Sequence, residues 1–314
     1  MKKVGLLLIL TLAAFAPSAA GQGATWTRYT YPGDEFSVEL PAMPWVFHTF
    51  RGGKGLRPAG LKVRVFGLYS DGIVYMVAAN DEPQKSESLD TFAGGLHGWW
   101  TLKPKGEATQ GGMNGGAYEV EGRTVRSHTQ ELYGEARAFR TKRHAYVVVA
   151  LSTADGRPEV ARFLDSLTID ENPAGESVKE DAPVPRFVPP EAAGSTQAAD
   201  EEMLKLVRRE GGGALPADGP FTMRDVERKA LIVYKPEPPY TEEARQNRVS
   251  GALRLRAVLS PDGRVTDVSA VSWLPHGLTD SAMRVARHML FFPAEKGGRP
   301  VPQYVLLEYN FSIY

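Results

Sequence analysis

The stretch KPEPPYTEEARQNRVSGALRLRAVLSPDGRV, residues 235–265, decides the fold of the last part of the chain. The three prolines before Tyr240 hold the backbone extended, because proline fixes φ and disfavours helix at the residue before it. Tyr240 follows as an amphipathic anchor, and Thr241 is a residue type that caps helix N-termini. A helix of about eight residues is too short to be stable alone. We therefore expect the prolines and Tyr240 to fix its start by tertiary contacts.

The residues after this helix predict an antiparallel hairpin. Leu253, Leu255, Ala257 and Leu259 alternate with polar residues, which is typical of a strand with one buried face. The turn falls at 261–263, where Gly263 is free to adopt a positive φ. The return strand, 265–271, alternates less clearly, and its two faces stay unassigned.

A second helix and a closing strand complete the pattern. The helix is expected to begin at a Thr279 cap, and its buried stripe follows the helical period: Ala282, Val285, Ala286, Met289 and Leu290. The residues 291–293 are expected to end it. The closing strand then buries alternate side chains, which are Val305, Leu307, Tyr309, Phe311 and Ile313.

These elements, in the order helix, strand, strand, helix, strand, resemble the C-terminal domain of TonB, the energy transducer of bacterial envelopes. The resemblance rests on 238–268, on GLTDSAMRVARHMLFFPAEKGGRPVPQYV and on EYNFSI. It implies a domain over 229–314 with a three-stranded antiparallel sheet packed by two helices. It also implies that the last strand lies at the sheet edge, where envelope partners such as the plug segments of outer-membrane receptors add a strand. Thr241 is a departure, because the family usually has a second proline there.

The resemblance and the physics of open sheet edges together predict the partner-binding residues. We expect them in the closing strand and just before the first helix: Lys235, Pro236, Glu237, Tyr240, Gln303, Val305, Leu306, Glu308, Asn310 and Ser312. Two other hypotheses stay open. The edge pairs with a second copy of the chain in a homodimer, or the run 230–234 folds back and pairs with the edge in cis.

Residues 26–170 predict a separate α+β domain. FSVEL (36–40) alternates as a strand, and 62–69 and 73–80 form a hairpin around Ser70-Asp71-Gly72. SLDTFAGGLHGWWTLK (88–103) is expected to be a helix capped at Ser86 or Ser88, and PEVARFLDSL (158–167) a second helix. The order loosely resembles exported domains of the PsbP-type α+β fold, in which helices pack an antiparallel sheet. This resemblance implies no functional residue.

The segment 171–228 has the composition of a linker, rich in Pro, Glu, Ala, Ser and Gly. We expect it to be largely disordered, with one short helix at 199–210. The fold class predicted for the chain is thus two α+β domains joined by a Pro-rich linker. A linker of this length lets the two domains move independently.

Residues 1–20 predict a secretory signal peptide, with Lys2 and Lys3 before the apolar run 4–16 and small residues at Ser18 and Ala20. The apolar run is shorter than the roughly 20 residues that span a bilayer. We therefore expect a cleaved, periplasmic protein; an uncleaved inner-membrane anchor is the alternative. The chain has no cysteine, so disulfides and thiol chemistry are excluded.

Composition argues against several function classes. Lys plus Arg and Asp plus Glu both number 37, so no basic surplus attracts a nucleic acid. The six histidines show no metal-ligand spacing such as HExxH, and no phosphate-binding or nucleophile motif is present. We expect no enzyme activity, no cofactor and no metal.

The function predicted from the sequence is that of a periplasmic TonB-like adaptor that binds envelope partners. A structural or cell-wall interaction protein is the alternative from another class. A membrane-anchored energy transducer is the third hypothesis, and it requires that the N-terminal segment stays uncleaved.

Overall fold

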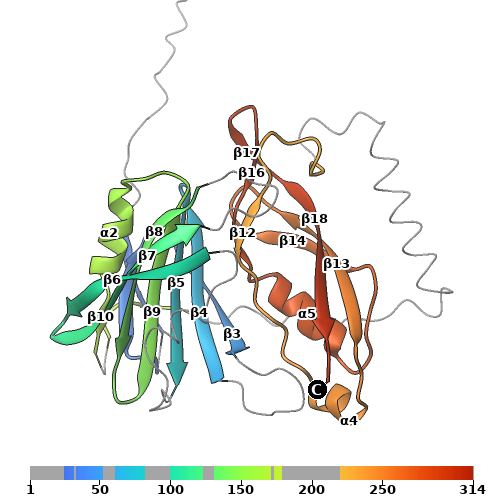
Figure 1. The fold of residues 1–314 in the computed structure, drawn as a ribbon, viewed down its shortest axis with the longest axis horizontal. Helices are drawn as coiled ribbons and strands as arrows, with labels where there is room; N and C mark the ends of the chain where they lie inside the picture. Colours follow the sequence, from blue (N-terminus) through green and yellow to red (C-terminus); the bar gives the residue numbers. More distant parts are fainter. Residues whose placement is uncertain are drawn as a thin grey trace, which may run out of the picture.

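In the computed structural model, the described residues form an N-terminal part within 25–178 and a C-terminal part within 220–313, which we call the N-terminal and C-terminal domains (Figure 1). The structure describes residues 25–31, 33–51, 61–81, 100–122, 131–170, 173–178 and 220–313. The predicted signal peptide lies outside these residues.

An antiparallel seven-stranded sheet forms the frame of the N-terminal domain. Its strands lie in the order β3-β4-β5-β9-β8-β7-β6. They are β3 (Trp45–Arg51), β4 (Leu61–Ser70), β5 (Ile73–Asp81), β6 (Trp100–Gln110), β7 (Met113–Gly122), β8 (Tyr133–Arg140) and β9 (His144–Ser152). The predicted hairpin is confirmed, since β4 and β5 pair across Asp71 and Gly72, both of which have positive φ.

The two central strands are buried on both faces. Every residue of β9 is buried, and in β5 all but the last. One face packs against a four-stranded sheet of order β10-β2-β1-β11 and against helix α2. These elements are β1 (Thr27–Thr30), β2 (Phe36–Leu40), β10 (Thr168–Ile169), β11 (Glu176–Ser177) and α2 (Pro158–Asp165).

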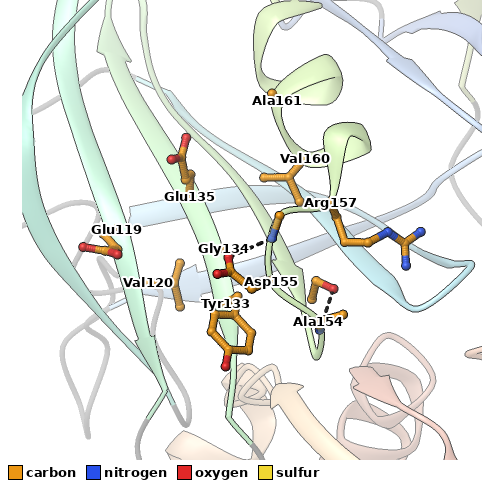
Figure 2. Close-up of a pocket in the computed structure, with 12 residues that line it drawn as sticks. Glu119, Val120, Tyr133, Gly134, Glu135, Ala154, Asp155, Arg157, Val160 and Ala161 are labelled. Carbon is orange, nitrogen blue, oxygen red and sulfur yellow. Dashed lines mark hydrogen bonds between the residues drawn. The ribbon is translucent and has the colours of Figure 1, made fainter.

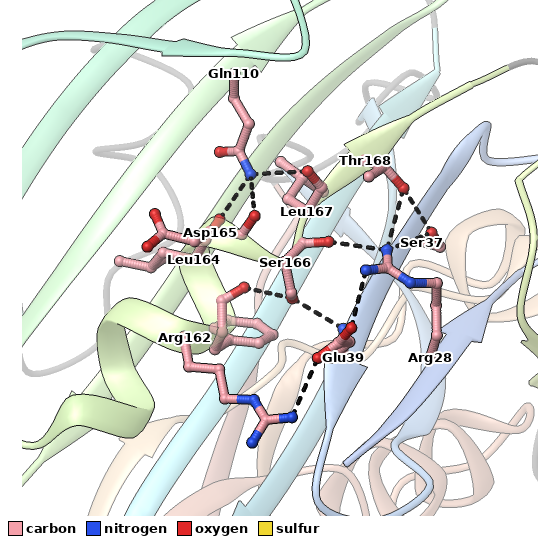
Figure 3. Close-up of polar contacts among 11 residues, drawn as sticks. Arg28, Ser37, Glu39, Gln110, Arg162, Leu164, Asp165, Ser166, Leu167 and Thr168 are labelled. Atoms are coloured by element: carbon pink, nitrogen blue, oxygen red, sulfur yellow. Dashed lines mark hydrogen bonds and ion pairs between the residues drawn. The ribbon is translucent and has the colours of Figure 1, made fainter.

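Polar contacts fasten α2 and β10 to this small sheet (Figure 3). Arg28 donates to Ser37 Oγ, to the Ser166 carbonyl and to Glu39. Gln110 Nε2 donates to the carbonyl oxygens of Leu164 and Leu167, at the end of α2. The end of the helix is thereby satisfied by side chains of two sheets.

One predicted helix of this domain is wrong at its end. The residues 100–103 belong to strand β6 rather than to a helix, because they pair with β7 from Trp100 onward. The rest of that prediction falls on 82–99, outside the described residues. The described N-terminal domain is therefore mainly strand, and the predicted α+β layout with several packing helices is not confirmed.

The C-terminal domain has the predicted three-stranded sheet, in the order β14-β13-β18. Its elements are α4 (Glu242–Gln246), β13 (Gly251–Leu259), β14 (Val265–Ala270), α5 (Leu278–Ala286) and β18 (Gln303–Phe311). Both helices pack against the buried face of the sheet. The alternation predicted for β13 and β18 matches their burial.

Three further features differ from the prediction. The strands β12 (Leu231–Tyr234) and β15 (Leu290–Phe292) pair with each other, and β16 (Ala294–Lys296) pairs with β17 (Arg299–Val301). Helix α5 thus ends before Leu290, which is in a strand. The predicted Thr279 cap is wrong, because Gly277 at φ 77° occupies the cap position. The Thr279 hydroxyl donates to the Leu274 carbonyl instead.

The two domains share a hydrophobic cluster. The second face of the seven-stranded sheet packs against the β12–β15 pair, with Val63, Met76, Val233, Leu290 and Phe292 in one cluster. Figure 1 shows β12 on the side of the C-terminal domain that faces this sheet. The expectation of independent domains is therefore wrong in this structure.

Both ends of the predicted linker are structured parts of the domains. At one end, β11 pairs in parallel with β1. At the other, Phe221 bridges to Gln303 and Arg228 bridges to Glu295. The middle of the linker, including its predicted helix, lies outside the described residues.

Candidate partner-binding edge

Strand β18 lies at the edge of the C-terminal sheet, with β13 on one side only. Its even-numbered side chains point away from the core, and Leu306 is 57% exposed, although it is apolar. Beside it on the same face, Arg256 is the cross-strand partner of Leu306, and its guanidinium lies 5.7 Å from the Tyr304 ring centroid. The outer face beside the edge is therefore both apolar and cationic.

The hydrogen bonds of Tyr304 show which backbone groups point outward. Tyr304 N donates to the Phe221 carbonyl, 2.8 Å away, on the side opposite β13. Because the N–H and C=O of one residue point the same way in an antiparallel strand, the even-numbered residues present their groups at the edge. Leu306, Glu308 and Asn310 thus form the outward row, and no strand of the described residues pairs with it.

Two groups of the chain itself contact this edge of β18. Phe221 accepts from Tyr304 and donates to the Pro302 carbonyl, so it covers the beginning of the strand. Lys235 Nζ donates to the Glu308 carbonyl at 2.6 Å and lies 4.3 Å from the Tyr309 ring centroid. Burial lowers the pKa of Lys235. Phe221 thus covers the start of the edge, and Lys235 occupies the Glu308 carbonyl. The edge between these two contacts is open.

Contacts of Thr241 and of the residues just before it confirm that the start of the short helix α4 is anchored. Thr241 Oγ1 accepts from Ala244 N as the N-cap and donates to the His276 carbonyl at 2.6 Å. Ser281 Oγ donates to the Pro239 carbonyl, and the Tyr240 ring packs edge-on against Phe311. The proline segment is thereby fixed to α5 and to the end of β18.

The structure brings together only part of the predicted site. Glu308, Asn310, Ser312 and Leu306 are exposed along the edge, and Lys235 and Glu237 lie on the neighbouring segment. Four other predicted residues point inward or are engaged: Gln303, Val305, Pro236 and Tyr240. Gln303 is buried and its Oε1 accepts from Ala230 N, so its side chain serves the fold.

Sequence analysis missed Phe221 and misjudged the run 230–234. Phe221 stands in a segment of linker composition, so nothing local marks it as a cap. The cis-pairing hypothesis for 230–234 is wrong, because β12 pairs with β15 rather than with β18.

A shallow pocket in the N-terminal domain is a weaker candidate (Figure 2). It lies between β7, β8 and the turn before α2, and Glu119, Glu135 and Asp155 line it together with Arg157 and Tyr133. Its volume is about 210 Å³, below the roughly 300–1,000 Å³ typical of small-molecule sites. Glu135 is paired with Lys105, and Arg157 with Glu159 and Asp71. The pocket offers no set of converging free groups on which a ligand class can be argued.

No helix in the described part of the chain is long and apolar enough to cross a membrane.

Comparison with known proteins finds a family match within the C-terminal domain. Residues 236–313 match the family model described as Gram-negative bacterial TonB protein C-terminal. The solution NMR structure of the Pseudomonas aeruginosa TonB CTD is similar to this chain at 19% identity and a TM-score of 0.25, over 30% of this chain and 93% of that one. No curated protein matches the chain.

Proposed function

We propose that this chain, whose residues 236–313 form a domain of the TonB C-terminal family, is a periplasmic adaptor that binds other envelope proteins by β-strand addition to β18. The family implies an envelope-related role in partner binding. Strand addition, the partner and the periplasmic location are the parts that need tests.

The observation that carries the proposal is the outward row of Leu306, Glu308 and Asn310. Unpaired backbone groups on an edge strand are a template for an incoming strand. Three outward residues at alternate positions match a partner strand of about five residues, since only every second residue pairs with each neighbour. Exposed Leu306 and the cationic Arg256 favour a partner strand with apolar and acidic side chains on that face.

Outer-membrane receptors are the partners that we propose first, because their plug segments engage this domain type. A second copy of the chain uses the same backbone groups, so a homodimer is the competing outcome. Light scattering of the free protein at increasing concentration detects the homodimer. If the dimer forms through β18, a receptor peptide inhibits dimerisation.

The decisive experiment compares Glu308→Pro with Glu308→Ala. Proline removes the outward N–H while leaving the bonds to β13, which involve the odd-numbered residues, since Tyr304 N points away from β13. Alanine removes the carboxylate and its exposed pair with Arg254 but keeps the N–H. The probe is a set of synthetic peptides that span receptor plug segments, measured by calorimetry.

We expect Glu308→Pro to weaken peptide binding about tenfold or more, since the lost hydrogen bond leaves a partner group unpaired. Glu308→Ala should bind within about twofold of wild type, because exposed ion pairs contribute little. Equal affinity of wild type and the proline variant, with both folded by circular dichroism, would contradict strand addition at β18.

The adaptor hypothesis also requires cleavage of the N-terminal segment. Sequencing the N-terminus of the protein from an envelope fraction should give a start at Gly21. A retained Met1 or Lys2 would instead support the membrane-anchored transducer.

A further inference from the structure

A cluster of charged side chains, four of them buried, lies at one end of the N-terminal domain. We define the Asp34 cluster as Asp34, Glu35, Arg64, Asp81, Arg143 and His144. Asp34 and Glu35 come from the turn between β1 and β2, and the others from β4, β5, the β8–β9 turn and β9. The cluster closes the core between the two sheets.

Strand alternation explains why three of these side chains meet. Phe66, Ala79 and Tyr146 face the four-stranded sheet. Arg64, Asp81 and His144 stand two residues away from them on the same strands, so they share that face. No linear motif marks this set, because its members are brought together only by strand pairing.

Arg64 donates hydrogen bonds to the carboxylates of Asp34 and Asp81, and one oxygen of Asp34 receives none from the described residues. Its Nε donates to Asp34 Oδ1 at 2.5 Å, and its two Nη atoms donate to Asp81 at 2.8 and 2.5 Å. Asp34 Oδ2 and His144 Nδ1 are both buried and make no hydrogen bond within the described residues. Asp34 is 1% exposed and His144 8%.

The candidate ligand atoms point to one another. His144 Nδ1 lies 3.3 Å from Asp81 Oδ1. The candidate donor atoms of Asp34, Asp81 and His144 all lie within 4.8 Å of one another. Oxygen and nitrogen ligands lie about 2.0–2.2 Å from zinc, which puts neighbouring ligands of a tetrahedron about 3.3–3.6 Å apart. The three side chains can reach this spacing with small movements.

The charges of the cluster leave room for a cation. Three carboxylates, those of Asp34, Glu35 and Asp81, stand against the two guanidinium groups of Arg64 and Arg143, which is one negative charge in excess when His144 is neutral. An uncompensated charge is costly in a buried site. A bound metal ion would supply the missing positive charge.

We propose that Asp34, Asp81 and His144 bind one divalent transition-metal ion, such as Zn²⁺, in a structural site. One imidazole nitrogen and two carboxylate oxygens are ligands that suit this class of ion. Arg64 binds Asp34 through Oδ1, the other oxygen of that carboxylate, and donates to both oxygens of Asp81, so it orients both acidic ligands. The metal would tie the β1–β2 turn to the large sheet.

Metal binding is tested on untagged full-length protein that has been treated with a chelator and dialysed. The probes are Co²⁺, followed by its visible absorption, and Zn²⁺, followed by calorimetry and thermal unfolding. We expect one equivalent of either metal, visible bands typical of four-coordinate cobalt and a higher Tm with Zn²⁺. His144→Gln should weaken binding at least about tenfold.

His276→Gln is the matched control. His276 lies in the C-terminal domain next to Glu243, 2.9 Å away, and its loss should leave binding unchanged. Absence of cobalt bands in the wild type, or equal affinity of wild type and His144→Gln, would overturn the proposal. If His144→Gln does not fold, an NMR titration of the wild type with cobalt decides. We expect the ring signal of His144 to broaden at the lowest cobalt concentration. Earlier broadening of any other of the six histidines would contradict the site.

Discussion

The ammonium group of Lys235 occupies an acceptor that an incoming strand would need. It donates to the Glu308 carbonyl at 2.6 Å, and that carbonyl points outward from β18. Lys235 also lies over the Tyr309 ring, which holds the side chain beside the edge. A partner strand that pairs at Glu308 must displace this contact.

Lys235→Met should therefore strengthen peptide binding. Methionine keeps the apolar stem and removes the competing donor, so the gain is about twofold to tenfold, the equivalent of about 0.5–1.5 kcal/mol for one net hydrogen bond. Calorimetry with the same receptor peptides measures the change. Weaker binding by the variant would mean that the ammonium group contacts the peptide rather than competing with it.

Tyr309 gives a prediction with a defined pH dependence. Burial raises the pKa of Tyr309, and its hydroxyl makes no hydrogen bond to any part of the chain that the structure describes. Tyr309→Phe should be neutral or stabilising by about 1 kcal/mol at pH 7, because it removes a buried unpaired hydroxyl.

The stability of Tyr309→Phe relative to the wild type should increase above about pH 10, the ordinary pKa of tyrosine. There the unfolded chain ionises before the folded one, so the wild type loses stability as pH rises, while the phenylalanine of the variant has no proton to lose. Urea unfolding at pH 7 and at about pH 10.5 measures the free energy of unfolding of both proteins on either side of that ordinary pKa. The same difference at both pH values would contradict the raised pKa.

At the scale of the element, the outward amides of β18 are predicted to be of two kinds, those with a hydrogen-bond acceptor in the chain and those that face no strand of the described residues. Tyr304 N donates to Phe221, whereas the N–H of Leu306 meets no strand of the described residues. Hydrogen exchange should therefore be slower at Tyr304 than at Leu306 in the free protein.

Phe221→Pro should speed exchange at Tyr304 without changing exchange at Leu306. Proline cannot donate to the Pro302 carbonyl, and it removes the ring over which the Lys296 ammonium lies. Phe221→Leu keeps the N–H and an apolar side chain, so it is the matched control. Unchanged exchange at Tyr304 in the proline variant would show that Phe221 does not protect the edge.

The elements that sequence predicted well are those with a complete periodic pattern. In β13 and β18 every second residue is apolar, and the burial follows it. The buried stripe of α5 is also correct, but the helix ends at Ala286 and Leu290 continues as strand β15. The apolar run 290–292 fits a buried helix or strand equally well, and only its pairing partner decides.

The parts that could not be predicted depend on contacts between distant segments. Phe221 protects β18 through backbone bonds, which carry no signature in its side chain. The Asp34 cluster joins residues that are far apart in the chain, since Arg64 bonds Asp34 over 30 positions and Arg143 bonds Glu35 over 108. A search for spaced motifs along the chain cannot find such a set.

At the scale of the whole molecule, the two domains pack against each other through specific rings and a glycine. The His288 ring stacks on Phe47 with centroids 4.6 Å apart and meets Trp45 edge-on. A Cβ at Gly263 would lie 2.4 Å from Tyr69 Cβ, so the β13–β14 turn approaches the large sheet too closely for a side chain. Sequence analysis assigned Gly263 to its turn, and the structure adds a second requirement from the other domain.

This packing predicts that the two domains unfold together. Val233 is fully buried in the cluster that β12 and β15 share with the seven-stranded sheet. Val233→Asp places a carboxylate there without a partner, which is strongly destabilising in a buried site. The wild type should show one calorimetric transition, and the variant two, because the domains then unfold separately.

Leu306→Asp is the matched control, since it makes the same change of apolar to acidic at an exposed site of the same domain. It should keep the single transition of the wild type. Two transitions in the wild type, or one in Val233→Asp at an unchanged Tm, would mean that the domains are not coupled. With coupled domains, a partner held on β18 is held by the whole molecule, because β12 of the C-terminal domain packs against the large sheet.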